Sequence, residues 1–176
     1  MKALIVVDMQ NDFVTDSLGS PDAQKIVPNV VQKVKDCLAA GDKVFFTRDT
    51  HTPAYLSTLE GKNLPVEHCI EGTHGWEIID ELKPFVDQSA GVIDKPTFGS
   101  YKLVDTLEPL IANDEVREIE LCGLCTDICV VSNALLLRAK FYETTITVDS
   151  SCCAGVTPDS HESALNTMRS CQINVL

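Results

Sequence analysis

The sequence predicts a single α/β domain with three layers, in which helices cover both faces of a mainly parallel six-stranded sheet. Runs that are typical of strands alternate with segments of helical periodicity along almost the whole chain. The length of 176 residues is within the usual range of one compact domain, and no repeat, linker or low-complexity segment divides it. We therefore treat residues 1–176 as one domain.

Short apolar runs rich in β-branched residues predict the strands, because strands buried on both faces have continuous rather than alternating hydrophobicity. The first run is ALIVV, and similar runs follow along the chain. The predicted strands cover residues 3–7, 43–47, 91–94, 118–122, 144–148 and 172–176.

The helices are predicted from apolar positions that recur every three to four residues. Residues 27–38 follow this pattern and are succeeded by Gly41, a typical stop signal. Segments 76–82 and 101–111 show helical periodicity as well, and segment 127–141 is apolar on most faces. The last of these helices should therefore be central in the domain.

A final helix should begin after Thr157, which is a good N-cap and is followed by a proline and an acid. This helix is expected to run to about Ser170. Residues 48–74 form a long polar segment that contains several prolines and glycines. A loop of that length in a compact domain is usually functional.

The composition is that of a soluble globular protein, with 44% hydrophobic and 23% charged residues. The formal net charge of −12 argues against binding to nucleic acid and to anionic membranes, which both select basic patches. No apolar run approaches the roughly 18 residues that span a bilayer. Asp8 interrupts the apolar run near the N-terminus and no cleavage site follows, so we expect a cytoplasmic protein without a signal peptide.

Eight cysteines are a high count for this length. In a cytosolic chain they are core residues, metal ligands or nucleophiles rather than disulfides. The spacing of Cys122, Cys125 and Cys129 does not match a zinc knot. Cys37, Cys122 and Cys171 lie in apolar patterns, and we expect all three to be buried.

Polar side chains follow the predicted strands directly. Asp8 follows the first strand, Asp49 and His51 the second, Lys95 ends the third, and Cys129 lies in the helical turn after the fourth. Each alone could be an ordinary loop, surface or core residue. Ligands bind beyond the carboxyl ends of parallel strands, so their shared edge favours a functional site. The helix start should also favour a thiolate at Cys129.

Three stretches, VVDMQNDF (6–13), Lys95 and CGLCTDICV (122–130), resemble the signatures of the isochorismatase-like cysteine hydrolases, in the order of that family. The resemblance extends over nearly the whole chain and implies the α/β/α fold of the family. It also implies a catalytic triad of Asp8, Lys95 and Cys129, with Cys129 as the nucleophile. Lys95 would then favour the thiolate, and Asp8 would transfer the proton.

The same resemblance implies a cis peptide between Leu124 and Cys125. The backbone N–H groups of Cys125 and Cys129 would form the oxyanion hole, a role that donors at a helix start also suit on physical grounds. Cys125 stands where the family usually has a small residue, so its thiol is expected to be incidental.

Residues 47–77 resemble the nicotinamidase pattern of Asp-x-His followed later by His-Cys and Gly-Thr-x-Gly. By that resemblance Asp49, His51 and His68 bind a divalent metal, which orients the substrate through its pyridine nitrogen. Two imidazoles and a carboxylate are suitable ligands for zinc, and also for iron or manganese. Zinc is the metal we expect.

Nicotinamidases often have a fourth metal ligand between the second and the third. Glu60 is the candidate here, and Glu67 is the weaker rival. His74 and His161 match no role in the family and are expected to be surface or capping residues.

The residues after Lys95, PTFGSY, resemble other branches of the family. Four apolar side chains are candidates for a pocket that binds a planar ring, although they could equally be core residues: Phe13, Phe98, Tyr101 and Leu124. For Tyr101, at a predicted helix start, the two readings are equally good.

The leading hypothesis is a metal-assisted cysteine amidase that acts on a small amide, most specifically a nicotinamidase/pyrazinamidase in NAD salvage, and we expect a homo-oligomer. A related amidase for a carbamoyl or ureido compound is the alternative. A non-catalytic ligand-binding homologue is a third reading, and the intact set of Asp8, Lys95 and Cys129 argues against it. Isochorismate ether hydrolysis fits poorly, because that branch uses neither the cysteine nor the metal.

Overall fold

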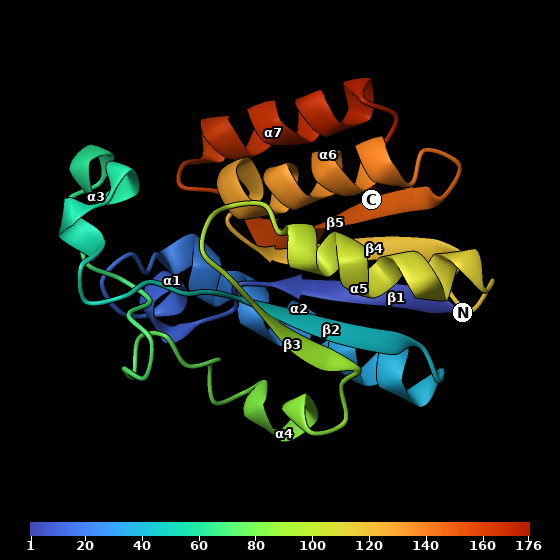
Figure 1. Ribbon diagram of the computed structural model, residues 1–176, viewed down its shortest axis with the longest axis horizontal. Helices are drawn as coiled ribbons and strands as arrows, with labels where there is room; N and C mark the ends of the chain where they lie inside the picture. Colours follow the sequence, from blue (N-terminus) through green and yellow to red (C-terminus); the bar gives the residue numbers. More distant parts are fainter.

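The computed structural model describes all residues from 1 to 176. Its six strands are β1 (Lys2–Val7), β2 (Lys43–Asp49), β3 (Gly91–Lys95), β4 (Glu118–Leu124), β5 (Thr145–Ala154) and β6 (Asn174–Val175). They form one sheet in the order β3-β2-β1-β4-β5-β6, and every neighbouring pair is parallel. The prediction of a parallel six-stranded sheet is therefore confirmed, and the arrows in Figure 1 all point the same way.

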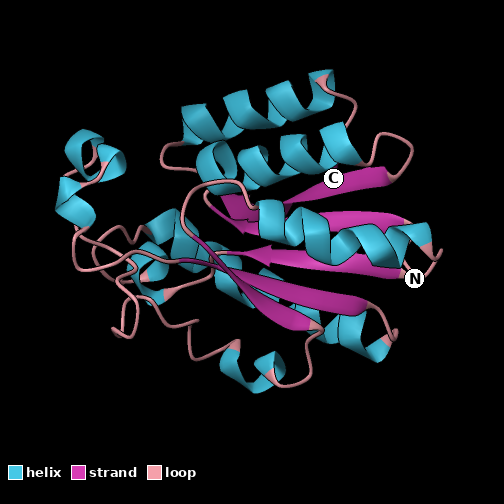
Figure 2. Ribbon diagram, viewed as in Figure 1, coloured by secondary structure: helices cyan, strands magenta, loops and turns pink.

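Seven α-helices accompany the sheet: α1 (Asn11–Val14), α2 (Pro21–Ala39), α3 (Leu59–Asn63), α4 (Lys83–Val86), α5 (Tyr101–Ala112), α6 (Val131–Lys140) and α7 (Pro158–Ser170). The long helix α2 crosses one face of the sheet, whereas α5, α6 and α7 cover the other (Figures 1 and 2). The small helix α3 projects beyond the carboxyl ends of the strands (Figure 1). The predicted three-layer arrangement is thus confirmed.

The core forms where the apolar strand runs meet the apolar faces of the helices. Residues 3–7 of β1 are completely buried, as a central strand covered on both faces should be. Each fully buried Leu, Ile or Val side chain contributes about 1.5–3 kcal/mol to stability. Ser20 caps α2 by accepting from Ala23 N, and Thr157 forms a capping box with Ser160 at the start of α7.

The prediction of a helix at residues 76–82 is wrong. This segment pairs with the chain after β1: Asn11 N donates to Glu77 O at 3.0 Å, and Ile79 N donates to Met9 O at 3.0 Å. These backbone groups are used in an antiparallel contact, so they are not free for helical hydrogen bonds. Only a single helical turn, α4, follows it.

The last predicted strand is shorter in the structure, and β5 is longer, with an irregular register opposite β4. Cys37 and Cys122 are buried as predicted, but Cys171 is exposed. Cys171 terminates α7 as its C-cap, one position past the helix, where no layer covers it.

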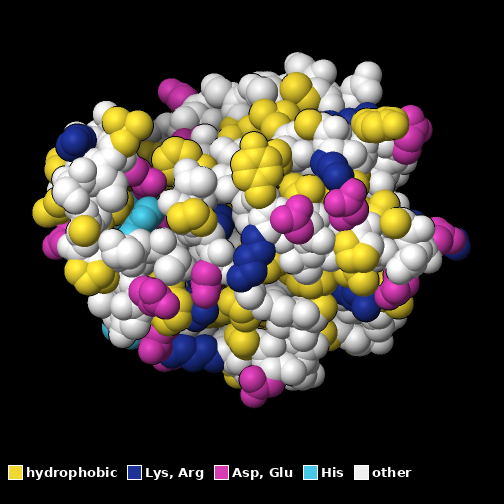
Figure 3. All heavy atoms as spheres, viewed as in Figure 1, with side chains coloured by type: hydrophobic (Ala, Val, Ile, Leu, Met, Phe, Trp, Pro, Cys, Tyr) yellow, Lys and Arg dark blue, Asp and Glu magenta, His cyan; other side chains and the backbone are white.

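No helix in the structure combines the length and the apolar character that crossing a membrane requires. Acidic and basic side chains are interspersed on the face drawn in Figure 3.

Candidate active site

The carboxyl ends of β1, β2 and β3 and the turn after β4 bring together the residues that the sequence singled out. Lys95 Nζ lies 2.6 Å from Asp8 Oδ2 and 3.4 Å from Cys129 Sγ. The same nitrogen lies 3.5 Å from Asp49 Oδ1 and donates to the carbonyl of Thr97. Lys95 is only 1% exposed, and neither Asp8 nor Cys129 is more than 4% exposed. The alternative that Lys95 is an ordinary solvent-exposed lysine is therefore wrong.

Asp8 is held by the neighbouring strand. Thr47 Oγ1 donates to Asp8 Oδ1 at 2.6 Å, and the Asp8 N–H donates to the carbonyl of Thr47 at 3.2 Å. The φ angle of Asp8 is 47°, a conformation that non-glycine residues rarely adopt and that is frequent at functional sites. The turn directs the carboxylate of Asp8 away from the strand and toward Lys95.

Burial is the largest cause of the shifted pKa values of Asp8 and Cys129. It raises the pKa of Asp8, and the charge of Lys95 offsets only part of that rise. Burial and then the charge of Asp8 raise the pKa of the Cys129 thiol well above its usual value, although Lys95 acts in the opposite direction. Burial thus acts on the pKa of Cys129 against the thiolate that the helix start was expected to favour.

The turn that carries Cys129 is a π-helical turn, Thr126–Val130, which continues into α6. The peptide between Leu124 and Cys125 is cis, as the family resemblance implied. Gly123 precedes it with φ 112°, and a Cβ there would lie 2.1 Å from the carbonyl oxygen of Val7. Only glycine allows β4 to pass this close to β1, so Gly123 fixes where the turn begins.

The backbone N–H of Cys125 donates to none of the acceptors in the loops and caps around it. It is thus free to bind a developing oxyanion beside the thiol. Asn133, one helical turn after Cys129, supports this region: its amide donates to Cys129 O and to Phe98 O and accepts from Ser100 N. Asn133 therefore connects the turn to the loop that follows Lys95.

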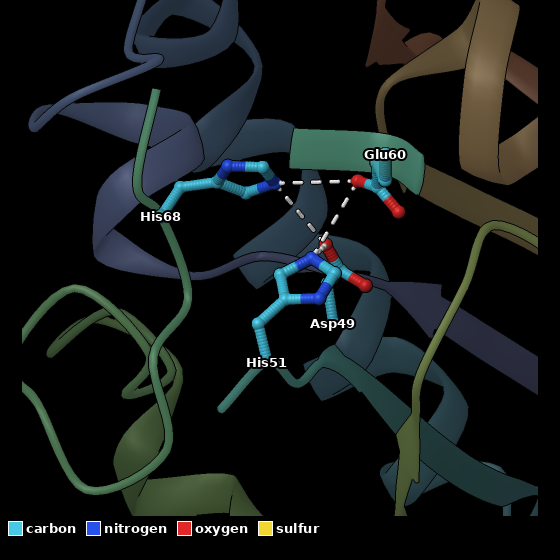
Figure 4. Close-up of side chains that lie close together, drawn as sticks. All are labelled: Asp49, His51, Glu60 and His68. Carbon is cyan, nitrogen blue, oxygen red and sulfur yellow. Dashed lines mark hydrogen bonds and ion pairs between the residues drawn. The ribbon is translucent and has the colours of Figure 1, made fainter. Parts of the chain in front are cut away.

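A second group of four side chains lies close together (Figure 4), and one of them, Asp49, is the residue near Lys95. Asp49 and His51 come from the end of β2, Glu60 from α3, and His68 from the loop that follows. One ligand atom from each residue lies within 4.8 Å of all the others. Glu67 is exposed and does not belong to this cluster.

The geometry and the chemistry of these four residues fit a divalent cation. The distances from His51 Nε2 and His68 Nε2 to the Asp49 and Glu60 oxygens range from 2.9 to 3.8 Å. Tetrahedral ligands at about 2.0–2.2 Å from zinc would be about 3.4 Å apart. Burial and the nearby Asp49 charge raise the pKa of Glu60, although His51, His68 and Lys95 act in the opposite direction. Asp49 Oδ1, moreover, is buried without a hydrogen-bond partner.

The ligand side chains are oriented by residues around them. His68 Nδ1 is 2.8 Å from the carbonyl of Val66, which places the proton on Nδ1 and leaves the Nε2 lone pair directed into the cluster. The buried ring of Tyr55 packs against both imidazoles, with centroids 4.7 Å from His51 and 4.9 Å from His68. Gln10 binds the backbone of Asp49 through both its amide oxygen and its amide nitrogen.

One cavity of about 450 Å³ connects the two groups, a volume within the usual range of small-molecule sites. Cys129 and Cys125 line it, together with Asp49, Glu60 and His68. Of the predicted pocket residues, the cavity is lined by Phe13, Phe98 and Leu124.

Tyr101 is not part of this cavity. Its side chain is 77% exposed at the first position of α5 and points into solvent. The prediction that it lines the pocket is therefore wrong. The helix start is stabilised by Ser100 and not by Tyr101, because the Ser100 side chain caps α5 by accepting from Leu103 N.

Sequence reasoning missed four supporting residues: Gln10, Thr47, Tyr55 and Asn133. All four side chains carry a polar group and are completely or almost completely buried. Gln10 lies inside the quoted VVDMQNDF stretch, and Thr47 lies two positions before Asp49, so their places in the sequence were a usable signal. No pattern in the sequence distinguishes Tyr55 or Asn133 from ordinary loop and helix residues.

Comparisons with known proteins agree with this site. Residues 2–176 match the model of the isochorismatase domain. The nicotinamidase/pyrazinamidase of Mycobacterium tuberculosis is 30% identical over 198 residues, covering 100% of this chain and 98% of that protein.

Solved structures extend the comparison. The pyrazinamidase of Pyrococcus horikoshii in complex with zinc has a TM-score of 0.84 and 28% identity, covering 99% of this chain and 98% of that one. The N-carbamoylsarcosine amidase of Thermoplasma acidophilum has a TM-score of 0.79 and 27% identity, covering 99% and 94%. Because the family model spans nearly every residue, the chain belongs to the isochorismatase domain family.

Proposed function

We propose that this protein is a metal-dependent cysteine amidase that hydrolyses nicotinamide, and pyrazinamide as an analogue, to the acid and ammonia. The observation that carries the proposal is that a single cavity is lined by the Cys129 thiol on one side and by Asp49, Glu60 and His68 on the other. A thiol beside an acid–lysine pair supplies amide chemistry. A cluster of nitrogen and oxygen ligands supplies a place to hold the ring.

The covalent steps follow from the arrangement of Asp8, Lys95 and Cys129. As the sulfur of Cys129 bonds to the amide carbon, the thiol proton passes to Asp8, whose raised pKa makes it a better base near neutral pH. The carbon–nitrogen bond then breaks, and Asp8 returns the proton to the departing ammonia. Water attacks the thioester, gives a proton to Asp8 and releases the acid, and Cys129 is reprotonated.

Lys95 and the backbone stabilise the charges that develop in these steps. Lys95 Nζ, 3.4 Å from Cys129 Sγ, favours the sulfur as it becomes negative. The N–H groups of Cys125 and Cys129 would hold the oxyanion, and removal of one such donor typically reduces kcat about 10²–10³-fold.

Asp49, His51, Glu60 and His68 would hold the metal, with zinc as the proposed ion. A metal bound there supplies a Lewis acid that a pyridine or pyrazine nitrogen can bind. Phe13, whose ring centroid is 5.5 Å from that of His68, would pack against the ring of the substrate.

The alternative is an amidase for a carbamoyl or ureido acid, the class of substrate in the name of the Thermoplasma relative. The cavity favours a neutral amide over such an anion, because Asp49 and Glu60 are its only formally charged lining residues apart from any bound metal. No lysine or arginine lines it to bind a carboxylate.

Ammonia release from four compounds tests the proposal: nicotinamide, pyrazinamide, benzamide and N-carbamoylsarcosine. Benzamide is the matched control, because it has the same shape as nicotinamide without the ring nitrogen. We expect nicotinamide and pyrazinamide to be hydrolysed at least about tenfold faster than benzamide, the size of one lost good interaction. A preference for N-carbamoylsarcosine would establish the alternative, and no ammonia from any compound would contradict the proposed activity.

A further inference from the structure

His161, on the first turn of α7, has an unusual partner. Its Nδ1 lies 2.8 Å from Oγ1 of Thr126. Thr126 is completely buried, and His161 is half-buried. The imidazole takes part in no ion pair and in no second side-chain hydrogen bond. The hydrogen bond with Thr126 is therefore the one polar side-chain contact of the His161 ring.

A second contact lies beside the first. Asp127 Oδ1 accepts a hydrogen bond from the N–H of Val156 at 3.0 Å. Gly155 makes the close packing possible, because a Cβ at this position would lie 2.8 Å from Cβ of His161. Two successive residues of the turn after β4 are thus held by the junction between β5 and α7. Gly155 and Val156 also line the cavity that contains Cys129.

The hydrogen bond from His161 to Thr126 matters because of where Thr126 lies in the turn. Thr126 directly follows Cys125, whose N–H is free for the oxyanion, and precedes Cys129 by three residues. A shift of Thr126 would move both the oxyanion donor and the nucleophile. It would leave Phe13 and the metal cluster in place, because those side chains come from other segments.

We infer that His161 is a positioning residue: through Thr126 it fixes the Cys125 N–H and the Cys129 sulfur relative to the amide carbonyl. The inference rests on the proposed amidase activity and extends it. Misplacing reacting groups by about 1 Å can reduce the rate about 100-fold without any change in the residues that touch the substrate.

His161 is not needed to keep α7 packed. The buried residues of this helix are Ala164, Leu165 and Met168, which lie on its inner face, and its start is fixed by the Thr157 capping box. A variant at position 161 should therefore fold. This separates a positioning role from a merely structural one.

The test uses the metal-loaded protein and four variants. His161→Ala and Thr126→Val each remove the contact, whereas His161→Asn keeps an amide group near the position of Nδ1. His74→Ala is the control, because His74 is 69% exposed and its closest charged partner is Asp16 at 3.7 Å. The first two variants should lower kcat about 10- to 100-fold with KM within about twofold. His161→Asn should keep kcat within about threefold of wild type, and His74→Ala should change neither constant.

The double variant His161→Ala/Thr126→Val should be no slower than either single variant, because both remove the same contact. Additive losses in kcat, or a loss of kcat in His161→Asn as large as that in His161→Ala, would overturn the inference. An unchanged kcat in His161→Ala, or a rise in KM alone, would overturn it as well.

A second measurement does not depend on the substrate. The rate of Cys129 alkylation by iodoacetamide at pH 8, followed by peptide mass mapping, should change at least about threefold in His161→Ala and return toward wild type in His161→Asn. If no amide is hydrolysed by the wild-type protein, the proposed function fails, and the alkylation rates still decide the role of His161. Equal rates in all four variants would overturn that role.

Discussion

The sheet carries two groups of charged side chains with little exposure to solvent, one against α2 and one at the carboxyl ends of the strands. The first, the α2-side cluster, consists of Lys2, Lys33, Glu120 and Asp149. Glu120 accepts from Lys2 at 2.5 Å and from Lys33, and Lys33 also pairs with Asp149 at 2.7 Å. Two positive and two negative charges balance, and each retains 7–26% side-chain exposure.

All four groups of the α2-side cluster favour their charged forms. Burial alone would raise the pKa of Glu120, but hydrogen bonds from Lys2 and Lys33 outweigh it and hold the pKa below its usual value. The pKa of Asp149 is lowered in the same way, chiefly by Lys33 against the effect of burial. Pairing therefore exceeds desolvation here, and the cluster stabilises the fold.

The group at the strand ends has similar residue types, but its acid Asp8 shows the opposite balance between pairing and burial. Asp8, Asp49 and Lys95 are at most 2% exposed, and the two acids share one lysine. Burial raises the pKa of Asp8 despite its ion pair. The difference shows what proton transfer requires of a carboxylate. When ion pairs fully compensate its charge and hold its pKa low, a carboxylate is a poor base, whereas the raised pKa of Asp8 favours accepting a proton.

The largest expected effect is that of Cys129→Ala, which should reduce kcat by about 10⁴-fold or more. The free energy of unfolding should stay within about 1 kcal/mol of wild type, because the α2-side cluster and most of the core are unchanged. Amide hydrolysis and urea denaturation measure the two quantities. Cys125→Ala is the matched control and should retain most of the activity, since its proposed role is that of a backbone donor. Equal losses in the two variants would show that both thiols take part.

The second effect concerns the metal ligands. His51→Ala should release the metal and raise KM for nicotinamide by about tenfold or more, because the ring nitrogen loses its partner. Glu60→Gln should weaken metal binding less, since Glu60 is 19% exposed and water can replace its oxygen. Elemental analysis of the purified variants measures the metal. A full metal content in His51→Ala would contradict the ligand assignment.

The third effect tests the α2-side cluster. Glu120→Gln should lower the free energy of unfolding by about 1–3 kcal/mol at pH 7, because Lys2 and Lys33 lose their shared partner. Its kcat/KM should be unchanged. Arg117→Ala is the control: it removes an exposed ion pair with Asp114 and should leave the free energy of unfolding close to that of wild type.

The same variant has a predicted pH dependence. The folded-state pKa of Glu120 is lowered, so its contribution to stability is present above the unfolded value of about 4.3 and is lost as the pH falls through the folded value. The stability difference between wild type and Glu120→Gln should therefore shrink below about pH 4. A difference that stays constant down to pH 3 would show that Glu120 acts by packing rather than by charge.

The smallest effect is expected outside both clusters. Cys171 is the only exposed cysteine, and the pKa of the Cys129 thiol is raised chiefly by burial. Iodoacetamide near pH 7 should therefore label Cys171 first, with no loss of activity, and Cys129 later and faster as the pH rises. Peptide mass mapping beside an activity assay follows both events. Activity that falls in step with the first label at Cys171 would contradict this order.

Several features could be predicted from the sequence because their causes are local. Continuous apolar runs gave the first four strands close to their observed bounds, and Thr157-Pro158 marked the start of α7. The polar residues Asp8, Asp49, Lys95 and Cys129 were expected at one edge of the sheet, since parallel strands end together. The structure brings these four residues together as expected.

Other features depend on contacts between distant segments. Residues 76–82 have a helical pattern, but their backbone pairs with the chain after β1, and no local signal reveals that. Tyr101 and Cys171 are apolar residues that were expected inside the protein, yet each lies at a helix end that no other layer covers.

The sequence by itself determined the residues of the site and the edge of the sheet where they lie, because hydrophobic period and strand ends are properties of neighbouring residues. Only the tertiary structure decided the surroundings that shift their pKa values. Full burial of Asp8 and Cys129 makes desolvation the largest cause and raises both pKa values, whereas the sequence pattern alone indicated a thiolate. The link from His161 to Thr126 joins residues 35 positions apart, and such a contact arises only when helix and turn pack together.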